Sequence, residues 1–506
     1  MDQKTPTLAD IQKDISELLR KKYGAEVGFQ SPEADGIKEG LPTEKKPVRI
    51  QFDLKPEELE AYLDEYVVKQ TEAKEILATK ICTHFQRVKL EEDEKEAIVG
   101  RIKNNIILIG PTGVGKTYLV RLIAKRIGVP FVKADATKFS ETGYVGGDVE
   151  DLVRDLVAEA NGNIELAQYG IIYIDEIDKI AASNAVIGPD VSRTGVQRNL
   201  LKLMEETEVD LKAPHDLASQ METVMQLQRT GKIERKKINT KNTLFIVSGA
   251  FTGLEEIIRK RISQRAIGFN ADLPSKGDVR MDILKRVRPD DLVTYGFESE
   301  FVGRLPVVAV LEPLNADDLH RILKNPNSSV ILSKKRDFEA YGITVDFEGP
   351  ALRKMAEMAY GEGIGARGLV SIVEKVLLKF EKRLPSTSIK QFTVAEDTVD
   401  DPEARLSELL FRASIEEFQR AFERENGISL SFSDEALRLI AGRAAEEGTT
   451  PASACEKILG GYGYGLKLLG AKEFLVDEQA IRGPEEHLDK LIKERYARAQ
   501  SVAPET

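Results

Sequence analysis

The apolar positions between residues 106 and 312 follow two alternating patterns. Short, continuous apolar runs predict buried strands at residues 106–109, 131–134, 171–174, 243–248 and 307–311. Apolar residues at intervals of three and four, as in the segment that follows residue 117, indicate amphipathic helices between these runs. Strands that alternate with helices favour a parallel sheet with helices on both faces. We therefore expect a large α/β domain over residues 55–312.

The regions on either side of this domain have different patterns. Residues 1–54 combine a short amphipathic helix at 8–22 with a linker that is rich in Gly, Pro, Glu and Lys. Residues 313–395 have a mostly helical pattern and predict a smaller domain, and residues 396–506 form a C-terminal extension. The polar interval 212–242 interrupts the alternation of strands and helices, which is typical of a surface excursion.

An internal repeat relates the smaller domain to the C-terminal extension. Residues 342–363 are echoed by residues 427–448 at a constant offset of 85, with matching Gly, Phe, Ala, Leu and Arg positions. We expect a degenerate second copy of the small domain, although two helices of similar pattern could also produce this match. The copy has Thr-Pro-Ala at 450–452 where the first has Gly-Ala-Arg at 365–367, so no nucleotide chemistry is expected of it.

Composition excludes several classes of protein. The 506 residues include 42% hydrophobic and 31% charged residues, with a net charge of −11, which argues against a nucleic-acid partner. No stretch approaches the roughly 20 apolar residues of a membrane span, and the acidic N-terminus suits neither a signal nor a transit peptide, so a cytoplasmic protein is expected. Two cysteines, Cys82 and Cys455, are typical of a reducing compartment and too few for a four-cysteine zinc module, so no zinc is expected.

A phosphate-binding motif follows the first predicted strand. Residues 110–117 fit the pattern G-x-x-x-x-G-K-[ST], in which backbone N–H groups and a helix N-terminus surround the phosphates of ATP. Lys116 would neutralise the β- and γ-phosphates, and the Thr117 hydroxyl would hold Mg²⁺. A glycine turn with an incidental lysine is the alternative. The predicted nucleotide contacts in this loop are Gly110, Pro111, Thr112, Gly113, Val114, Gly115, Lys116, Thr117 and Tyr118.

A second motif predicts that the bound ATP is hydrolysed. The apolar run at 171–174 ends in two adjacent carboxylates, Asp175 and Glu176. Asp175 would order the Mg²⁺ shell, and Glu176 would polarise the attacking water, because phosphoryl transfer depends on positioning and charge stabilisation. A strand that ends in solvated acids is the alternative, but the phosphate loop upstream favours the catalytic interpretation.

Eight segments, taken in order, resemble the Clp-type AAA+ protein unfoldases, and most of all the ClpX type. They are residues 64–70, 110–117, 143–150, 170–179, 190–197, 248–251, 300–306 and 365–369. The resemblance covers about residues 55–395. Within it, the sequence of residues 136–144 is closer to that of the sister unfoldase HslU. It implies an AAA+ large domain with a P-loop at 55–312 and an AAA+ small domain at 313–395 that carries the sensor-2 arginine.

The resemblance also implies roles for single residues. Tyr66, Val67 and Val68 would face the adenine. Arg304 would be the arginine finger that reaches a neighbouring subunit's ATP, and Arg367 would be the sensor-2 arginine that joins the small domain to the nucleotide. The implied catalytic residues are Lys116, Asp175, Glu176, Arg304 and Arg367, with Ser248 at the sensor-1 position.

Two further segments match loops with which this family contacts other proteins. The pore loop is Gly143, Tyr144, Val145 and Gly146, where an aromatic ring between flexible glycines would grip an extended polypeptide. The second segment is Ile267, Gly268 and Phe269, which matches the tripeptide that docks into a ClpP-type peptidase. Ordinary packing into the core is the alternative for both.

The expected function is an ATP-dependent unfoldase that forms a homohexamer and threads protein substrates into a ClpP-type peptidase. A peptidase-independent remodelling chaperone with the same motor is one alternative, and a nucleic-acid motor or clamp loader is another. Three departures from the ClpX pattern affect specificity. Residues 1–54 lack the N-terminal zinc domain, the interval 212–242 lacks the Arg-Lys-His substrate-tag triplet, and the extension 396–506 has no recognised counterpart.

Overall fold

The computed structural model describes residues 52–94, 102–140, 147–182, 191–211, 236–265 and 279–501. These residues all belong to the second of two compact units, which spans Arg49–Thr506. The helix expected at 8–22 and the linker that follows it lie outside the described residues. None of the described helices has both the length and the apolar character that are needed to cross a bilayer.

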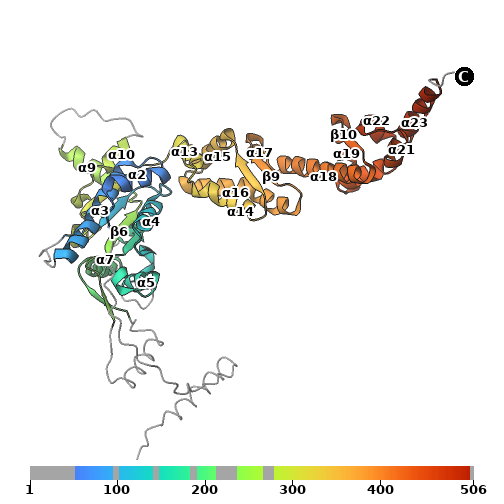
Figure 1. Ribbon diagram of the computed structural model, residues 1–506. Coiled ribbons are helices and arrows are strands. Elements are labelled where there is room, and N and C mark those ends of the chain that lie inside the picture. The colour runs from blue at the N-terminus through green and yellow to red at the C-terminus, as the bar shows by residue number, and fades with distance from the viewer. Residues whose placement is uncertain are drawn as a thin grey trace, which may run out of the picture. The chain divides into compact units, whose positions relative to one another are not determined.

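A parallel sheet of five strands forms the centre of the large domain, in the order β2-β3-β6-β1-β7. The strands are β1 (Ile106–Ile109), β2 (Phe131–Asp135), β3 (Ile171–Asp175), β6 (Leu244–Gly249) and β7 (Val307–Val310). All five strands that the apolar runs predicted are present, and β1 lies between its register partners in β6 and β7. Helices surround the sheet (Figure 1), so the predicted α/β class is confirmed.

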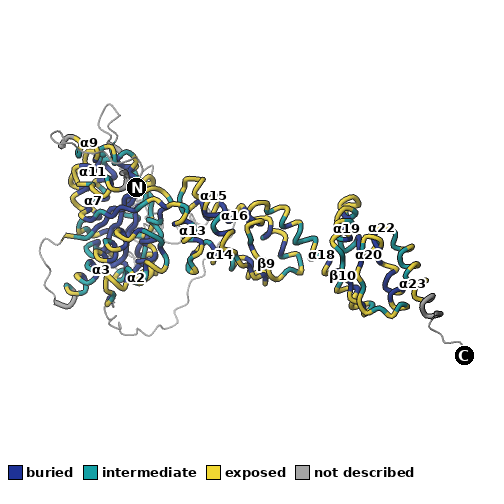
Figure 2. Tube along the Cα trace, turned by 90° about the horizontal axis from the view of Figure 1, so that it is seen from above, coloured by how far each residue is buried: buried dark blue, intermediate teal, exposed yellow. Residues whose placement is uncertain are grey.

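Each strand divides its side chains between two hydrophobic cores, because successive residues of a strand point to opposite faces. In β1, Ile107 and Ile109 belong to one core, and Ile106 and Leu108 to the other. The first core packs under helices α5 (Asp151–Glu159), α7 (Val191–Met204), α9 (Leu254–Arg265), α11 (Pro289–Tyr295) and α12 (Ser299–Gly303). The second packs under α2 (Pro56–Tyr66), α3 (Thr71–Glu94) and α4 (Lys116–Ile127). Figure 2 shows the buried residues concentrated between these helices.

Smaller elements complete the large domain. Helices α6 (Ile164–Ala167) and α10 (Val279–Leu284) connect the larger ones, and short 3-10 turns lie at Ala136–Lys138 and Ile177–Ile180. Strands β4 (Glu208–Asp210) and β5 (Lys237–Asn239) form an antiparallel pair at the two ends of the predicted surface excursion. The residues between them, 212–235, lie outside the described residues.

Residues 314–406 enclose a separate hydrophobic core. Its elements are α13 (Ala316–Lys324), α14 (Ser329–Glu339), β8 (Thr344–Phe347), α15 (Gly349–Gly361), α16 (Ala366–Arg383), a 3-10 turn (Leu384–Ser386), β9 (Gln391–Val394) and α17 (Glu396–Asp400). Strands β8 and β9 pair in parallel. The stacked rings of Phe380 and Phe392, with centroids 4.6 Å apart, join α16 to this pair.

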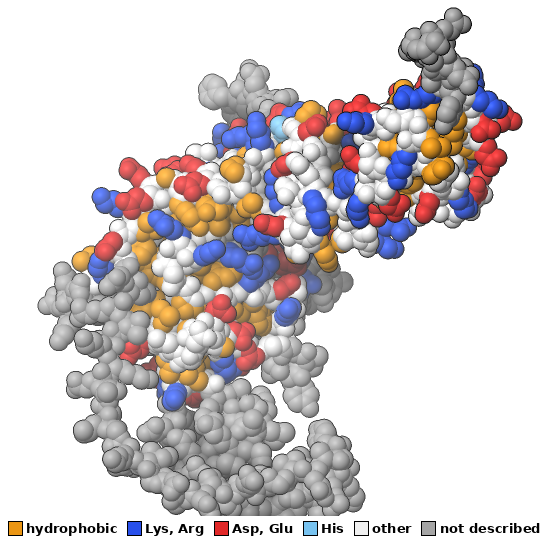
Figure 3. All heavy atoms as spheres, turned by 45° about the vertical axis from the view of Figure 1, so that its right-hand side comes forward, with side chains coloured by type: hydrophobic (Ala, Val, Ile, Leu, Met, Phe, Trp, Pro, Cys, Tyr) orange, Lys and Arg blue, Asp and Glu red, His pale blue; other side chains and the backbone are white. Residues whose placement is uncertain are grey.

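A fourth core lies in the C-terminal extension. Its elements are α18 (Pro402–Asn426), β10 (Ser429–Phe432), α19 (Asp434–Glu447), α20 (Pro451–Leu459), α21 (Tyr462–Leu468), β11 (Glu473–Val476), α22 (Glu478–Arg482) and α23 (Pro484–Ser501). Helix α18 contributes Leu406 to the third core and Phe418 to the fourth, so one continuous helix belongs to both. On the face seen in Figure 3, acidic and basic side chains are interspersed.

The two C-terminal cores share an order of strand, helical connection, strand and short helix. Strand β10 begins 85 residues after β8, and β11 begins 82 residues after β9. Both strand pairs are parallel and both are spanned by a helical connection. Helix α22 likewise begins 82 residues after α17, so the difference between the two offsets arises within the helical connection.

Candidate nucleotide-binding site

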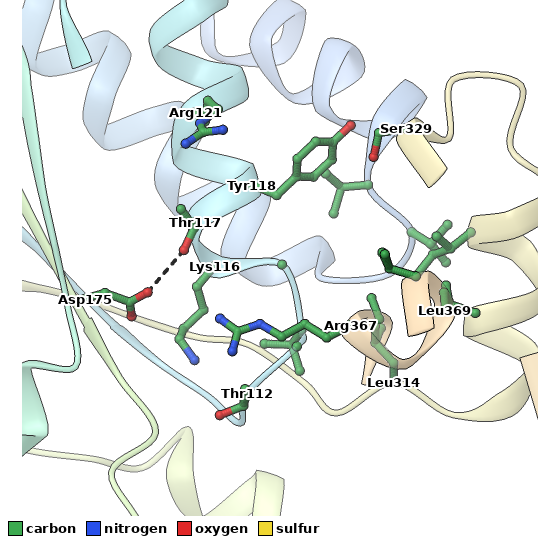
Figure 4. A pocket seen from close by; sticks show the side chains of 18 of the residues that line it. Thr112, Lys116, Thr117, Tyr118, Arg121, Asp175, Leu314, Ser329, Arg367 and Leu369 are labelled. Atoms are coloured by element: carbon green, nitrogen blue, oxygen red, sulfur yellow. Dashed lines mark hydrogen bonds between the residues drawn. The ribbon is translucent and has the colours of Figure 1, made fainter. Parts of the chain in front are cut away.

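A cavity of about 640 Å³ lies where the large domain meets residues 314–370. The phosphate loop and the end of β3 contribute Thr112, Gly113, Val114, Gly115, Lys116, Thr117, Tyr118, Asp175 and Glu176. The segment after α2 contributes Tyr66, Val67 and Val68, and the small domain contributes Arg367. Gly110 and Pro111, which were also predicted to contact the nucleotide, do not line the cavity. Figure 4 shows Lys116, Thr117, Asp175 and Arg367 directed towards a common space.

The phosphate loop needs its glycines for conformation and for space. Gly113 and Gly115 have φ angles of +77° and +97°, in the region that L side chains rarely adopt. A Cβ at Gly113 would also lie 2.1 Å from the carbonyl oxygen of Ile364. Gly115 ends the loop as the N-cap of α4, so the first N–H groups of that helix face the cavity region.

Lys116 is held at the base of the loop. Its Nζ donates to the carbonyl oxygens of Gly110 at 2.6 Å and Pro111 at 2.9 Å. Burial lowers the pKa of Lys116, the nearby carboxylates of Asp175 and Asp178 act in the opposite direction, and Arg367 adds to the lowering. A phosphate would supply the negative charge that this partly buried ammonium group needs.

Asp175 lies in a network of hydroxyl groups. Ser248 Oγ donates to its Oδ1 at 2.6 Å, and the Thr117 hydroxyl donates to its Oδ2 at 3.3 Å. The Tyr173 hydroxyl lies 2.6 Å from Ser248 Oγ and 3.2 Å from the Thr117 hydroxyl, so it shares the Thr117 proton with Asp175. These bonds fix Thr117 and Asp175 side by side, as two hard oxygen ligands.

The carboxyl group of Asp175 is kept ionised. Burial alone would raise its pKa, but the Ser248 hydroxyl, the Glu176 N–H and the charges of Lys133 and Lys116 together lower it. Lys133 on β2 lies 3.5 Å from Oδ2. An ionised carboxylate beside a hydroxyl fits Mg²⁺, which is bound in nucleotide sites through one or two carboxylates, water and phosphate oxygens.

Glu176 has an unusual backbone conformation. Its φ and ψ angles are 55° and 33°, in the left-handed region, at the point where β3 passes into the turn Ile177–Ile180. Such a conformation in a non-glycine residue is uncommon and is found at functional sites. It places Glu176 between the main cavity and an adjoining hollow that Arg193 also lines.

The small domain closes the cavity through direct contacts with the loop. The N–H of Ala366 donates to the carbonyl oxygen of Gly113 at 2.8 Å, which places the start of α16, and with it Arg367, over the phosphate loop. Gly365 has a φ of +64°, and a Cβ there would lie 2.8 Å from Gly113 O. The structure thus brings Arg367 to the cavity from a residue 251 positions beyond Lys116.

The segment Tyr66–Val68 is fixed by the two residues that follow it. Lys69 and Gln70 have φ angles of +63° and +59°, which turns the chain sharply after α2. The buried Gln70 side chain exchanges two hydrogen bonds of 2.7 Å with the backbone of Glu312, and Lys69 Nζ pairs with Asp318 at 3.3 Å. The predicted adenine-facing residues are therefore anchored to the junction of the two domains.

Arg304 is not brought together with the other implied catalytic residues. It follows α12, its guanidinium pairs with Glu205 at 2.5 Å, and its side chain is 53% exposed. Asn105 holds its carbonyl oxygen at 3.1 Å. An arginine outside the cavity of its own chain can reach a nucleotide only if that nucleotide is bound to another subunit.

Sequence reasoning missed several residues of the cavity. Lys133, Ile322, Ser328, Ser329, Val330, Leu369 and Val370 also line it. Tyr173 does not line the cavity, but its contacts with Ser248 and Thr117 were also missed, although a Tyr in a buried strand is a signal that its hydroxyl has a partner. Apart from Arg367 and Leu369, which belong to the segment 365–369, the small-domain residues carried no local signal, because only the approach of the two domains makes them part of the site.

Comparison with known proteins identifies the family. Residues 101–308 match the family described as AAA domain (Cdc48 subfamily). The chain is 39% identical over 358 residues to the ATP-dependent Clp protease ATP-binding subunit ClpX 3 of Methylococcus capsulatus, covering 68% of this chain and 80% of that protein. It is 39% identical over 334 residues to the ATP-dependent Clp protease ATP-binding subunit ClpX of Treponema denticola, covering 65% and 77%. This chain belongs to the ClpX family. It is therefore an AAA+ ATPase, as the sequence predicted.

Several expectations fall on residues that the structure does not describe. The pore loop, Gly143, Tyr144, Val145 and Gly146, lies outside the described residues. So does the docking segment, Ile267, Gly268 and Phe269. Both remain predictions from the ClpX resemblance. The described residues include no cluster of three or more His, Cys, Asp or Glu side chains suited to a metal ion.

Proposed function

We propose that this ClpX-family ATPase is an unfoldase that threads protein substrates into a ClpP-type peptidase. The observation that supports the proposal most is the composition of the nucleotide cavity, which takes Lys116 and Asp175 from the large domain and Arg367 from the small one. A nucleotide that contacts both domains stabilises their closed arrangement, and its hydrolysis removes part of that stabilisation. ATP turnover would thereby be coupled to movement of one domain against the other.

The residues of the cavity divide the chemistry among them. Lys116 and the loop N–H groups bind the phosphates, Thr117 and Asp175 hold Mg²⁺, and Glu176 orients the attacking water. When bound there, Mg²⁺ would supply positive charge that offsets the charge developing on the γ-phosphate. Arg367 lies over the phosphate loop at the start of α16, where a change in the charge of the phosphates alters its contact with them.

Assembly into a ring completes the site. Arg304 lies outside the cavity of its own chain, half exposed at the surface. In a closed ring, each subunit presents this arginine to the nucleotide of its neighbour, and we propose a homohexamer by similarity to the family. Hydrolysis would then depend on contact between subunits, which coordinates successive power strokes around the ring.

Two loops are proposed to carry the protein contacts. Tyr144 would grip the polypeptide in the central pore, and Ile267 with Phe269 would enter apolar clefts of the peptidase. The names of both relatives place them in an ATP-dependent Clp protease, which supports a peptidase partner here. Each apolar side chain that is fully desolvated contributes roughly 1.5–3 kcal/mol, and a ring presents several copies at once.

We further propose that the C-terminal extension is a second copy of the small-domain fold. The common order of elements and the matching strand spacings support this, as does the sequence echo at 342–363 and 427–448. The alignment with the Methylococcus relative covers 68% of this chain, so about a third of the chain is not shared with it. This unshared third is the reason to retain a peptidase-independent remodelling chaperone as the second candidate function.

A three-part assay separates the candidates. Glu176→Gln protein, which should bind ATP without turnover, is used to recover a natural substrate from cells. The purified unmodified protein is then tested with ATP for unfolding of that substrate and, with the ClpP-type peptidase of the same organism, for its degradation. Tyr144→Ala should abolish both activities while ATP hydrolysis continues.

Deletion of Phe269 should abolish degradation and leave unfolding intact. Unfolding without any degradation by the unmodified protein would favour the chaperone. Retention of unfolding by Tyr144→Ala would contradict the pore-loop assignment.

A further inference from the structure

Ser328 carries a buried hydroxyl group without a hydrogen-bond partner. The residue is only 6% exposed, and its Oγ forms no hydrogen bond with any of the described residues. Ser328 is the N-cap residue of α14, yet its side chain does not cap that helix. Buried polar groups are rarely left without a hydrogen bond, so one that has no partner in the protein is expected to bond to a ligand or to water. Ser328 also lines the nucleotide cavity.

The position of this hydroxyl is fixed by contacts between the two domains. The side-chain amides of Asn325 and Asn327 both donate to the carbonyl oxygen of Glu65, at 2.9 and 3.3 Å. The Ser328 N–H donates to the carbonyl oxygen of Asn325 at 2.8 Å. The turn before α14 is therefore tied to the end of α2, directly before the segment Tyr66–Val68 that lines the same cavity.

Ser328 belongs to the end of the cavity that is remote from the phosphates. In Figure 4, its neighbour Ser329 lies beside Tyr118, across the cavity from Asp175. Apolar residues contributed by the small domain line the cavity as well, namely Leu314, Ile322, Val330, Leu369 and Val370. An apolar slot with a few polar groups at its margin is the arrangement that binds and orients a flat heterocycle. With the phosphates at Lys116, this end is left for the base.

Nearby acceptors are already engaged. The carbonyl oxygen of Glu65 receives two amide hydrogen bonds, and that of Val67 receives Lys74 Nζ at 3.1 Å. The N-terminus of α14 offers backbone N–H groups, which are donors. The Ser328 hydroxyl, in contrast, has no hydrogen-bond partner among the described residues and can accept from an amino group at this place.

We propose that Ser328 is a base-specificity residue whose Oγ accepts a hydrogen bond from the 6-amino group of adenine. The inference rests on the nucleotide site described above and extends it to the recognition of the base. A site built around a hydrogen bond rejects an analogue that lacks the matching group, because the buried partner is then left unpaired. Ser328 therefore favours 6-aminopurine nucleotides over purine nucleotides that have hydrogen at position 6.

Competition binding tests this assignment without any need for hydrolysis. A fluorescent ADP is displaced from the full-length protein by ADP, by purine riboside 5′-diphosphate, which lacks the 6-amino group, or by 2′-deoxy-ADP. In Ser328→Ala, affinity for ADP and 2′-deoxy-ADP should fall roughly 5–10-fold, the usual effect of one hydrogen bond. Affinity for purine riboside 5′-diphosphate should not fall, because the variant has no hydroxyl to leave unpaired, and this retained affinity also shows that the variant is folded.

Two further variants make the test specific. Ser328→Cys keeps nearly the same volume with a weak acceptor, and should lose ADP affinity like the alanine variant. Ser333→Ala, on the exposed side of the same helix, should bind all three nucleotides like the unmodified protein. Unchanged ADP affinity in Ser328→Ala, or an equal loss for purine riboside 5′-diphosphate, would overturn the proposal. A loss of affinity for ADP but not for 2′-deoxy-ADP would mean that the Ser328 hydroxyl bonds to the ribose 2′-hydroxyl, and this would also overturn the proposal. Failure of the unmodified protein to bind ADP would instead reject the nucleotide site itself.

Discussion

Replacing Gly365 with alanine tests whether nucleotide binding depends on contact between the two domains. Gly365 has a φ of +64° and a ψ of −146°, a combination that is essentially restricted to glycine. Its added Cβ would lie 2.8 Å from Gly113 O, the atom that accepts the hydrogen bond from Ala366 N. The substitution therefore strains the backbone and separates the start of α16 from the phosphate loop.

The size of the effect follows from these two contributions. The backbone strain costs about 1–3 kcal/mol, and loss of the hydrogen bond between the domains costs about 1 kcal/mol. Together they destabilise the closed arrangement by about 2–4 kcal/mol. Even 1.4 kcal/mol of this, if it falls on the nucleotide-bound state, weakens ADP binding about tenfold. We expect at least that loss in Gly365→Ala.

Gly363→Ala is the matched control. Gly363 lies in the same turn and has a φ of +70°, but no atom lies within 4 Å of the position of its Cβ. Its replacement should lower the thermal unfolding midpoint through strain of about 1–2 kcal/mol and leave ADP affinity unchanged. Isothermal calorimetry gives the affinities, and a thermal melt gives the midpoints. If Gly365→Ala binds ADP as tightly as Gly363→Ala, the domain contact does not contribute to nucleotide binding.

Three further predictions concern the chemistry of the site. Glu176→Gln should bind ATP normally but hydrolyse it at least roughly 10²-fold more slowly, measured as phosphate release. Lys116→Ala, in contrast, should weaken ATP binding itself. Near-normal hydrolysis by Glu176→Gln would contradict the role of Glu176. Arg304→Ala should keep ADP binding and lose hydrolysis, and mixing it with Glu176→Gln subunits should restore part of the activity; full activity in a monomeric preparation would contradict a finger that acts between subunits. The interactions that lower the pKa of Asp175 stabilise the folded protein fully at pH values above the ordinary carboxyl pKa of about 3.9. This stabilisation is lost as the pH falls through the lowered pKa. Ser248→Ala should therefore move acid unfolding, followed by circular dichroism, to higher pH, and an unchanged midpoint would show that this hydrogen bond does not stabilise the carboxylate.

Local patterns in the sequence were sufficient for the sheet and the phosphate loop. The run Ile106–Ile109 predicted β1 because a strand buried on both faces needs apolar residues at every position. The spacing from Gly110 to Thr117 predicted the loop because all its contacting groups are contiguous in the chain. Asp175 and Glu176 were predicted for the same reason, since both belong to the end of one strand.

Other features were decided only by tertiary structure. Ser328 and Lys133 carry no local mark of function, and they line the cavity because separate elements pack around it. The separation of Arg304 from the cavity is likewise a property of the folded domain, and it supports the action on a neighbouring subunit that the family resemblance implies. Periodicity records which face of an element is buried, whereas it does not record which distant element covers that face. Sequence thus determined the elements and the contiguous motifs of this protein, and the packing of two domains determined which side chains share the nucleotide site.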